Sequence, residues 1–488
     1  MAPPVIIAVD IGTSGARALV FDTDGRDLAQ QRVPYPTHHP YPGWAEQDPD
    51  GIVDAVIGVL RSAVDGLADR SALVGVVFCA QMYSVLAVDR AGTPLTPSLT
   101  WADMRAVDVI TTARPQLRDL PARTGCPLQA LYPFAKILWM RQHIDLPSDA
   151  RFIAIKDYVV MRLTGQLLTD WSTASASGLL DIGQLKWDRE ALTAAGLDID
   201  HVPPLVSPRH TIRGWAPDVR AQIGLEGDVP LIVGGGDAPL ANIGVGATAP
   251  GTIAINLGTS AAARAFIHNP LTDPAGRLWT YAADDQRWVL GGIIGSGGVV
   301  FEWLLKQALH GVASFAEAEA LAGSIAPGAE NLLFVPYLSG EQSPGWNARS
   351  TGVLFGLTLR HQAAHIMRAT MEGIVFALLR AAQPIAQVST YQLAKIYLTG
   401  GLSMSPIWRQ VIADVFGTTV VVPASPESSA RGAAIIGLMA LGLADSYAPF
   451  AQPETLLHPN PDNHAAYARY FERFCEVNAQ MQAIDHLH

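Results

Sequence analysis

Asp10-Ile-Gly-Thr-Ser-Gly-Ala16 recurs in altered form as Asn256-Leu-Gly-Thr-Ser-Ala-Ala262, in the second half of a 488-residue chain. Each copy follows a β-branched apolar run, at residues 5–9 and 252–255, so each Gly-Thr-Ser is predicted to turn a buried strand back on itself. Such a turn presents backbone N–H groups and two hydroxyls to one point, which suits a phosphate. Gly-Thr-Ser is also ordinary hairpin material, and a chance match stays open at this stage.

The order of predicted elements repeats with the turn. Strands are expected at residues 5–9, 16–21 and 27–33 in the first half and at 252–255 and 261–267 in the second, and helical patterns follow in each half, over 101–195 in the first. Strands that open each half and helices that close it fit a duplicated α/β fold. We therefore expect two domains, residues 1–246 and 247–488, with the two turns gripping one polyphosphate across a central cleft.

Composition excludes several classes of protein. The chain has 33 Lys and Arg against 44 Asp and Glu, a net charge of −11, so neither nucleic acid nor an anionic membrane surface is expected as a partner. No apolar stretch approaches the length of a membrane span, and the N-terminal apolar run lacks the basic region of a signal peptide. Three widely separated cysteines suggest free thiols, and hence a cytoplasmic protein.

Two carboxylates stand at predicted strand ends. Asp237 follows Val233-Gly-Gly-Gly236, where it could take the proton of a hydroxyl that attacks a γ-phosphoryl group, or could cap the following helix. Asp10 precedes the first turn, where it could hold the water shell of Mg²⁺ or form an Asx turn. The second copy has Asn256 in the place of Asp10, which suggests that one half handles metal and the other only phosphate.

Two longer stretches carry a resemblance to a known family. Residues 133–143, Pro-Phe-Ala-Lys-Ile-Leu-Trp-Met-Arg-Gln-His, fit the first diagnostic pattern of the FGGY carbohydrate kinases, with Leu131 departing from it. Residues 352–357 and 365–372 fit the second pattern throughout. On their own, both stretches would be interpreted as helices with an apolar packing face. The resemblance extends over residues 6–443, and it implies a pair of ribonuclease-H-like domains of the actin-like ATPase kind.

The resemblance also implies a nucleotide site that uses ATP and Mg²⁺, with Asp10 on the metal side and Asp237 as the general base. Taken alone, the glycines before Glu302 indicate a helix N-terminus suited to anions or a close helix contact. The residues expected at the nucleotide are Gly12, Thr13, Ser14 and Arg17 from the first half, and Gly258, Thr259, Gly298, Glu302, Gly400, Gly401 and Ser405 from the second.

The substrate side is expected at two loops of the first half. Trp101 would offer an apolar wall, Asp103 an acceptor for hydroxyl groups and Arg105 a cation for a carboxylate or phosphate. As structural alternatives, the residues before them could belong to the core, and Asp103 with Arg105 could form an exposed pair. The full set of expected substrate residues is Gln81, Met82, Tyr83, Trp101, Asp103, Arg105 and Asp237.

Within the family, the chain is most similar to gluconate kinases, followed by xylulose kinases. The expected reaction is phosphorylation of a terminal hydroxyl of a small open-chain sugar acid or ketose, with D-gluconate as the first substrate and D-xylulose as the second. Tyr83 stands where those kinases commonly carry histidine, which weakens charge complementarity to gluconate at that position.

Two rival classes predict different behaviour. An actin- or chaperone-like ATPase would hydrolyse ATP without any sugar, and a dinucleotide oxidoreductase would need a Gly-x-Gly-x-x-Gly turn after the first strand, which this sequence lacks there. The sequence leaves the oligomeric state open, with a homodimer among the possibilities.

Overall fold

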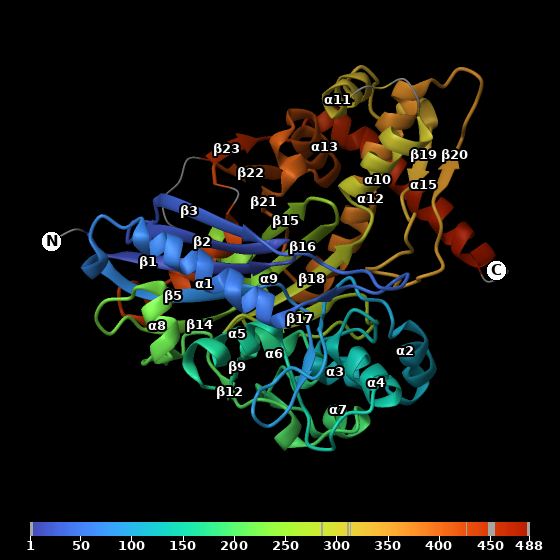
Figure 1. Ribbon diagram of the computed structural model, residues 1–488. Coiled ribbons are helices and arrows are strands. Elements are labelled where there is room, and N and C mark those ends of the chain that lie inside the picture. The colour runs from blue at the N-terminus through green and yellow to red at the C-terminus, as the bar shows by residue number, and fades with distance from the viewer. Residues whose placement is uncertain are drawn as a thin grey trace.

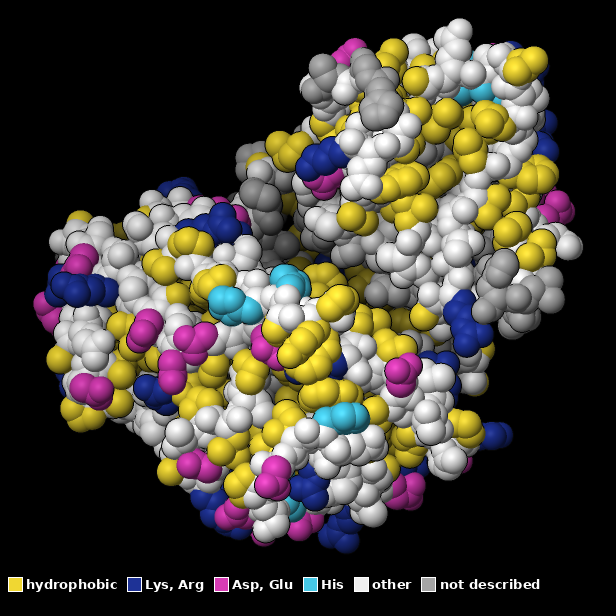
Figure 2. Space-filling view, turned by 45° about the vertical axis from the view of Figure 1, so that its right-hand side comes forward, with side chains coloured by type: hydrophobic (Ala, Val, Ile, Leu, Met, Phe, Trp, Pro, Cys, Tyr) yellow, Lys and Arg dark blue, Asp and Glu magenta, His cyan; other side chains and the backbone are white. Residues whose placement is uncertain are grey.

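The chain folds into two lobes with a hollow between them (Figures 1 and 2). The structure is a computed structural model that describes residues 3–284, 286–309, 312, 314–425, 427–447 and 454–485. Each lobe is built around one twisted mixed sheet, and the two sheets share a topology. The duplicated α/β fold predicted from the repeated turn is therefore confirmed.

The first lobe contains a six-stranded sheet in the order β13-β14-β5-β1-β2-β3. Strand β1 pairs antiparallel with β2 and parallel with β5, so the first Gly-Thr-Ser turn joins two neighbouring strands. The strands are β1 (Val5–Gly12), β2 (Gly15–Asp22), β3 (Asp27–Pro34), β5 (Leu73–Ala80), β13 (Thr211–Ile212) and β14 (Leu231–Gly236).

The second lobe repeats this arrangement in a seven-stranded sheet, β17-β18-β16-β15-β21-β22-β23. Strand β15 pairs antiparallel with β16 and parallel with β21, as β1 does with β2 and β5. The strands are β15 (Thr252–Leu257), β16 (Ala261–Ile267), β17 (Trp279–Ala282), β18 (Trp288–Ile294), β21 (Lys395–Thr399), β22 (Thr419–Pro423) and β23 (Glu454–Leu457).

Helices cover the outer faces of both sheets (Figure 1). Helix α1 (Pro49–Asp65) begins where the Asp48 side chain accepts a hydrogen bond from the Asp50 amide, and it buries one apolar face against the first sheet. The other helices of the first lobe are α2 (Val107–Ala113), α3 (Leu120–Thr124), α4 (Pro133–His143), α5 (Ile155–Thr164), α6 (Trp171–Ser175), α7 (Arg189–Ala194), α8 (Pro217–Ile223) and α9 (Asp237–Val245).

The second lobe has fewer and longer helices. Its longest, α12, packs against β18, the short strand β19 (Leu333–Val335) and helix α13 (Pro406–Phe416). The helices are α10 (Gly298–Trp303), which continues as a π-helical turn over Leu304–Ala308, α11 (Phe315–Gly323), α12 (Ala363–Ser389), α13 (Pro406–Phe416), α14 (Ser428–Ala440) and α15 (Pro461–Asp485). Short 3₁₀ turns lie at Arg70–Ala72, Arg114–Gln116, Ile199–His201, Ala329–Asn331 and Gly401–Met404.

Helices α2 to α7 lie within residues 101–195, where helical pattern was expected to dominate. The short strands β8 to β11 interrupt these helices: β8 and β9 pair with strands outside this segment, whereas β10 pairs with β11 within it. The small two-stranded pairs are β4 (Glu46–Gln47) with β7 (Ser98–Leu99), β6 (Leu86–Val88) with β8 (Arg151–Ile153), β9 (Thr169–Asp170) with β12 (Leu205–Val206), β10 (Leu180–Asp181) with β11 (Lys186–Trp187), and β19 (Leu333–Val335) with β20 (Val353–Phe355).

Two helices, α9 and α14, join the lobes. They cross so closely that a Cβ on Gly244 would lie 1.9 Å from the Ser428 carbonyl oxygen, and one on Gly432 would lie 1.8 Å from that of Leu240. Only glycine permits this approach of two backbones. Helix α14 belongs to the second half of the sequence, yet it also packs against β1 and β5 of the first sheet. An apolar cluster containing residues of both halves surrounds the crossing.

Candidate active site

The first Gly-Thr-Ser turn collects side chains from three separate segments. The Thr13 hydroxyl donates to the Gln81 Oε1 atom at 3.2 Å and accepts from the indole N–H of Trp101 at 3.0 Å. Gln47 donates to the Thr13 carbonyl oxygen at 2.7 Å and accepts from the Gln81 amide at 2.8 Å. Nearby, the Ser14 hydroxyl accepts from Arg32. Predicted phosphate residues and predicted substrate residues thus meet at one place.

Asp10, at the end of β1, is buried, and the Arg17 guanidinium pairs with it. Arg17 also pairs at 2.6 Å with Glu427, which directly precedes α14. A carboxylate beside a phosphate turn is the kind of ligand that Mg²⁺ takes together with phosphate oxygens and water. Asp10 therefore fits the metal side of the site, and Arg17 bridges the two halves of the chain.

Asp237 is the first residue of α9, directly after the glycine run that ends β14. The run bends there, because Gly234 has a φ of 68° and packs onto the backbone of Phe78. The carboxyl group is partly exposed, and burial, followed by the negative charge of Asp10, raises its pKa to about 7. A pKa near the working pH suits a group that must accept a proton and release it again.

The second turn lines a cavity of about 550 Å³ in the second lobe. Of the residues predicted at the nucleotide, five line it: Gly258, Thr259, Gly298, Glu302 and Gly401. Gly400 precedes the 3₁₀ turn at its edge, and Ser405, just before α13, has a buried hydroxyl without a hydrogen-bond partner among the described residues. The structure therefore brings the second-half set together.

The start of α10 differs from the expectation of an anion-binding helix N-terminus. The Gly298 amide donates to the Gly258 carbonyl at 2.8 Å, and the Val299 amide donates to that of Thr259 at 3.1 Å. These two N–H groups hold the turn in place. Glu302 faces the cavity rim and pairs with Lys306 on the exposed side of the helix.

The segment after β5 presents Gln81, Met82 and Tyr83. Met82 is buried against Gly236 of the glycine run. Tyr83 has a φ of 68°, and its hydroxyl accepts from the Tyr281 hydroxyl of the second lobe at 3.1 Å. Burial raises the pKa of Tyr83 above its usual value, so the phenol stays neutral. Tyr83 thus links the two lobes at the base of the cleft.

Trp101 is 43% exposed, but the side chains of Asp103 and Arg105 are buried. Asp103 accepts from the Ala45 amide at 2.7 Å and from Arg105 through both of its oxygens. The Arg105 guanidinium also pairs with Glu46 at 2.7 Å and lies 3.6 Å from the ring centre of Trp44. This differs from both expectations for the pair, because its polar atoms satisfy one another inside the lobe instead of facing a ligand or bulk water.

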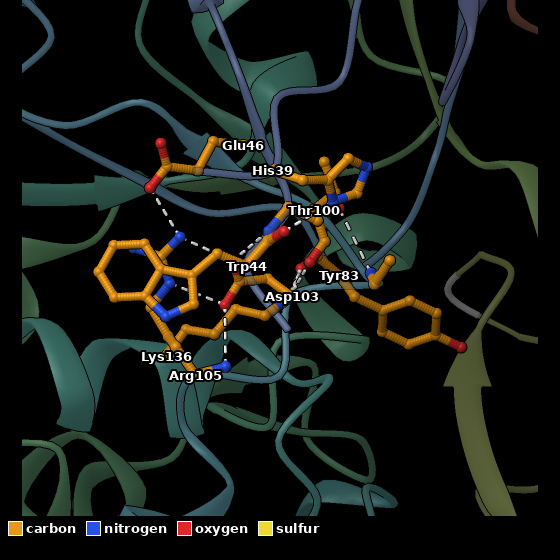
Figure 3. Close-up of polar contacts among 10 residues, drawn as sticks. His39, Trp44, Glu46, Tyr83, Thr100, Asp103, Arg105 and Lys136 are labelled. Atoms are coloured by element: carbon orange, nitrogen blue, oxygen red, sulfur yellow. Dashed lines mark hydrogen bonds and ion pairs between the residues drawn. The ribbon is translucent and has the colours of Figure 1, made fainter. Parts of the chain in front are cut away.

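Lys136 is a residue that sequence reasoning assigned to packing alone. Its ammonium group is fully buried and donates to the carbonyls of Thr100 at 2.6 Å and Tyr83 at 2.9 Å (Figure 3). Burial lowers its pKa to about 7, although the nearby charge of Asp103 acts in the opposite direction. Lys136 therefore ties together the two loops that carry the predicted substrate residues. The sequence feature that could have indicated this role is the position of a lysine on the otherwise apolar, buried face of α4.

Comparison with known proteins agrees with this arrangement. Residues 5–244 match the N-terminal domain of the FGGY family of carbohydrate kinases, and residues 253–441 match its C-terminal domain. The chain therefore belongs to the FGGY family of carbohydrate kinases, which implies the use of ATP and an alcohol group as phosphoryl acceptor.

Individual relatives are similar over most of their length. A gluconokinase from Bacillus subtilis is 34% identical over 455 residues, which cover 91% of this chain and 88% of that protein. A xylulose kinase from Escherichia coli is 30% identical over 417 residues, 84% of each chain. The crystal structure of a gluconate kinase from Lactobacillus acidophilus superimposes with a TM-score of 0.94 at 29% identity, covering 98% of both chains.

The helices of the described ranges are all too short or too polar to cross a membrane.

Proposed function

We propose that this protein transfers the γ-phosphoryl group of ATP to a terminal hydroxyl of D-gluconate. Asp237 accepts the proton of the attacking hydroxyl, and the turns at residues 12–14 and 258–260 hold the phosphates from opposite sides of the cleft. The observation that supports this proposal is a partly buried carboxyl group at the start of α9, after the glycine run, whose pKa is raised to about 7 by burial and by the negative charge of Asp10 at the first turn. Similarity to gluconate kinases supports the choice of acceptor.

The nucleotide is proposed to lie along the 550 Å³ cavity of the second lobe, with its phosphates toward the first lobe. Asp10 would hold Mg²⁺, which when bound neutralises phosphate charge and orients the β- and γ-phosphates. Arg17, already poised between Asp10 and Glu427, would contact the phosphates as the lobes close. Residues 1–246 and 247–488 then act as two domains, the first for sugar and metal and the second for nucleotide.

Closure of the lobes would serve two purposes. It would bring the hydroxyl and the γ-phosphorus into line, and it would exclude water so that ATP is not simply hydrolysed. Tyr83 and Tyr281, which meet across the lobes, are suited to shielding the base of the cleft.

D-Xylulose is the second candidate acceptor, and Tyr83 is the observation that favours it. A neutral phenol gives a sugar acid no charge complementarity at that position, whereas a ketose needs none.

An ADP-release assay over D-gluconate, D-xylulose, D-ribulose, glycerol and erythritol tests the proposal. We expect kcat/KM for D-gluconate to exceed that of every other compound by at least about tenfold, because about 1.4 kcal/mol of preferential binding is enough for that ratio. A higher kcat/KM for D-xylulose would establish the second candidate. ADP release that no polyol accelerates would reject both.

A further inference from the structure

Strand β16 carries a buried cation that lacks a partner within the described residues. Arg264 is only 6% exposed, and its Nε atom has no hydrogen-bond partner there. No hydrogen bond from its guanidinium and no carboxylate within 4.0 Å is found in the described ranges. A desolvated guanidinium is costly unless it is paired, so an unpaired one in a native fold points to a ligand.

The alternation of β16 directs Arg264 into the space between the lobes. Ala263, Ala265 and Ile267 belong to the core of the second lobe. Phe266, two residues after Arg264 and on the same face, belongs instead to the cluster between the lobes. Arg264 therefore faces the first lobe, where the negative charge of Asp237 acts on it.

A second unpaired donor lies in the same row of the sheet. Arg264 is opposite Gly291 on β18, and Gly291 is opposite Trp279 on β17. The Trp279 ring covers Gly291, since a Cβ there would lie 2.4 Å from a ring carbon, so the ring extends along the row that holds Arg264. The indole N–H of Trp279 is also buried without a described acceptor. Two buried donors without a described acceptor therefore lie in one row of the sheet, and an anion is the kind of group that could accept from both.

The position of Arg264 along the strand separates it from the phosphate turn. Arg264 lies three residues beyond Ala261, the first residue of β16 after that turn, which is about 10 Å along a strand. Its carbonyl oxygen accepts from Asn242, one and a half turns into α9 from Asp237. The backbone of Arg264 is thus deeper in the cleft than either the turn or the base. A group bound there belongs to the acceptor and not to ATP.

Other arginines predicted at the site are already engaged. Arg105 is held by Asp103, Glu46 and Trp44 (Figure 3), and Arg17 is held by Asp10 and Glu427. The sequence had assigned the role of carboxylate receptor to Arg105. Because Arg105 is engaged in this way, a carboxylate of the substrate would have to be bound by another residue.

We propose that Arg264, together with the indole N–H of Trp279, binds the carboxylate of the sugar acid and thereby selects it over neutral sugars. The inference rests on the proposed function and names the part of the site that recognises the acid. A guanidinium accepts a carboxylate with two parallel hydrogen bonds, and an uncharged sugar would leave both donors unsatisfied. A neutral sugar would therefore bind more weakly than a sugar acid, because the buried donors would lose water without gaining an acceptor.

The test compares an anionic and a neutral acceptor in Arg264→Gln and Arg264→Lys. We expect Arg264→Gln to lower kcat/KM for D-gluconate about 10²-fold or more, with D-glucitol and D-xylulose changed less than about threefold. Arg264→Lys keeps the charge but not the fork, and should fall between Arg264→Gln and the wild type. Titration calorimetry with D-gluconate should show the same order of affinities. Arg213→Gln, which removes an exposed arginine that pairs with Asp228, is the matched control.

The possible outcomes separate this inference from the proposed function. Wild-type enzyme without gluconate turnover would reject the proposed function, and this inference with it. Wild-type turnover with unchanged gluconate preference in both variants would reject only the role of Arg264. An equal loss for gluconate and neutral acceptors, with melting temperatures unchanged, would assign Arg264 to the transferring phosphoryl group and overturn the proposal. If Arg264→Gln does not fold, the Arg264→Lys ratio decides in the same way.

Discussion

Each Gly-Thr-Ser turn joins two antiparallel strands, but two residues separate the paired positions at the first turn and three at the second, and the surroundings of the turns also differ. The first has the charged pair of Asp10 and Arg17 beside it and contacts Gln81 and Trp101 through Thr13. At the second, Asn256 donates a hydrogen bond to the neutral Thr399, and backbone amides of α10 donate to the carbonyls of the turn. One copy thus has side chains suited to metal and acceptor, and the other has a cavity suited to a nucleotide. The comparison supports the proposal that the two copies of the turn serve different parts of one site.

The largest effect is expected at Asp237, the proposed proton acceptor at the start of α9. Asp237→Asn removes the proton acceptor but keeps the size of the side chain, so kcat should fall about 10³-fold or more. Nucleotide affinity, measured by calorimetry, should stay within about threefold, because the second lobe supplies that cavity. Asp228→Asn, an exposed carboxylate, is the control. Turnover of Asp237→Asn within tenfold of wild type would assign the chemistry elsewhere.

Exchanging the residue that distinguishes the turns tests the division of labour directly. Asp10→Asn gives the first turn the residue of the second, and kcat should fall roughly 10²-fold with weaker metal binding. Asn256→Asp makes the reciprocal change and should weaken nucleotide binding only about tenfold, through repulsion of phosphate. Mn²⁺ binding followed by electron paramagnetic resonance reports on the metal independently of turnover. Equal metal affinity in both variants and wild type would contradict the assignment.

A smaller and more selective effect is expected at Lys136, which donates hydrogen bonds to the two loops that carry the proposed acceptor residues. Lys136→Met leaves the buried carbonyls of Tyr83 and Thr100 without their donor, at a cost of about 1–3 kcal/mol each in stability or loop order. We expect KM for the sugar to rise about tenfold while KM for ATP changes less than twofold. Lys306→Met, an exposed lysine on the nucleotide side, provides the opposite comparison. Parallel rises in both KM values would mean that Lys136 is merely structural.

The smallest effect concerns stability and pH. The raised pKa of Asp237 means that the folded protein holds this proton more tightly than the unfolded chain does. The resulting stabilisation is complete below about pH 4 and is lost as pH rises through 7. Without metal or nucleotide, Asp237→Asn should therefore be more stable than the wild type at pH 8 by about 1–2 kcal/mol, a free energy that is lowered to allow for the partial exposure of Asp237. Near pH 4 the two proteins should be equally stable. Melting curves at both pH values measure the difference, and a constant offset would contradict it.

Local patterns predicted much of the fold and part of the site. The strands around both turns were predictable because a β-branched run, a Gly-Thr-Ser turn and a second run are adjacent in sequence. The cavity-lining residues Gly258, Thr259 and Gly298 followed from family resemblance. Asp103 with Arg105 was misjudged because its burial depends on Trp44 and Glu46, almost sixty residues away. Local periodicity contains no information about such partners.

The roles of the two buried cations, Lys136 and Arg264, could not be predicted from the sequence. A lysine in a helix or an arginine in a strand is ordinarily solvated, so neither Lys136 nor Arg264 stands out by type. Only the assembled lobes reveal that Lys136 bridges two loops and that Arg264 faces the other lobe. Both are conflicts between local chemistry and global burial, and such conflicts concentrate at functional sites.

Helices α9 and α14 cross with their backbones in contact at Gly244 and Gly432, so the packing of one half of the chain depends on the other. Because α14 packs on the first sheet although it belongs to the second half, a fragment that ends at residue 246 would lack part of its own apolar cover. We therefore expect such a fragment to fold less stably than it does within the whole chain, because α14 of the second half buries apolar surface that the first half cannot cover by itself.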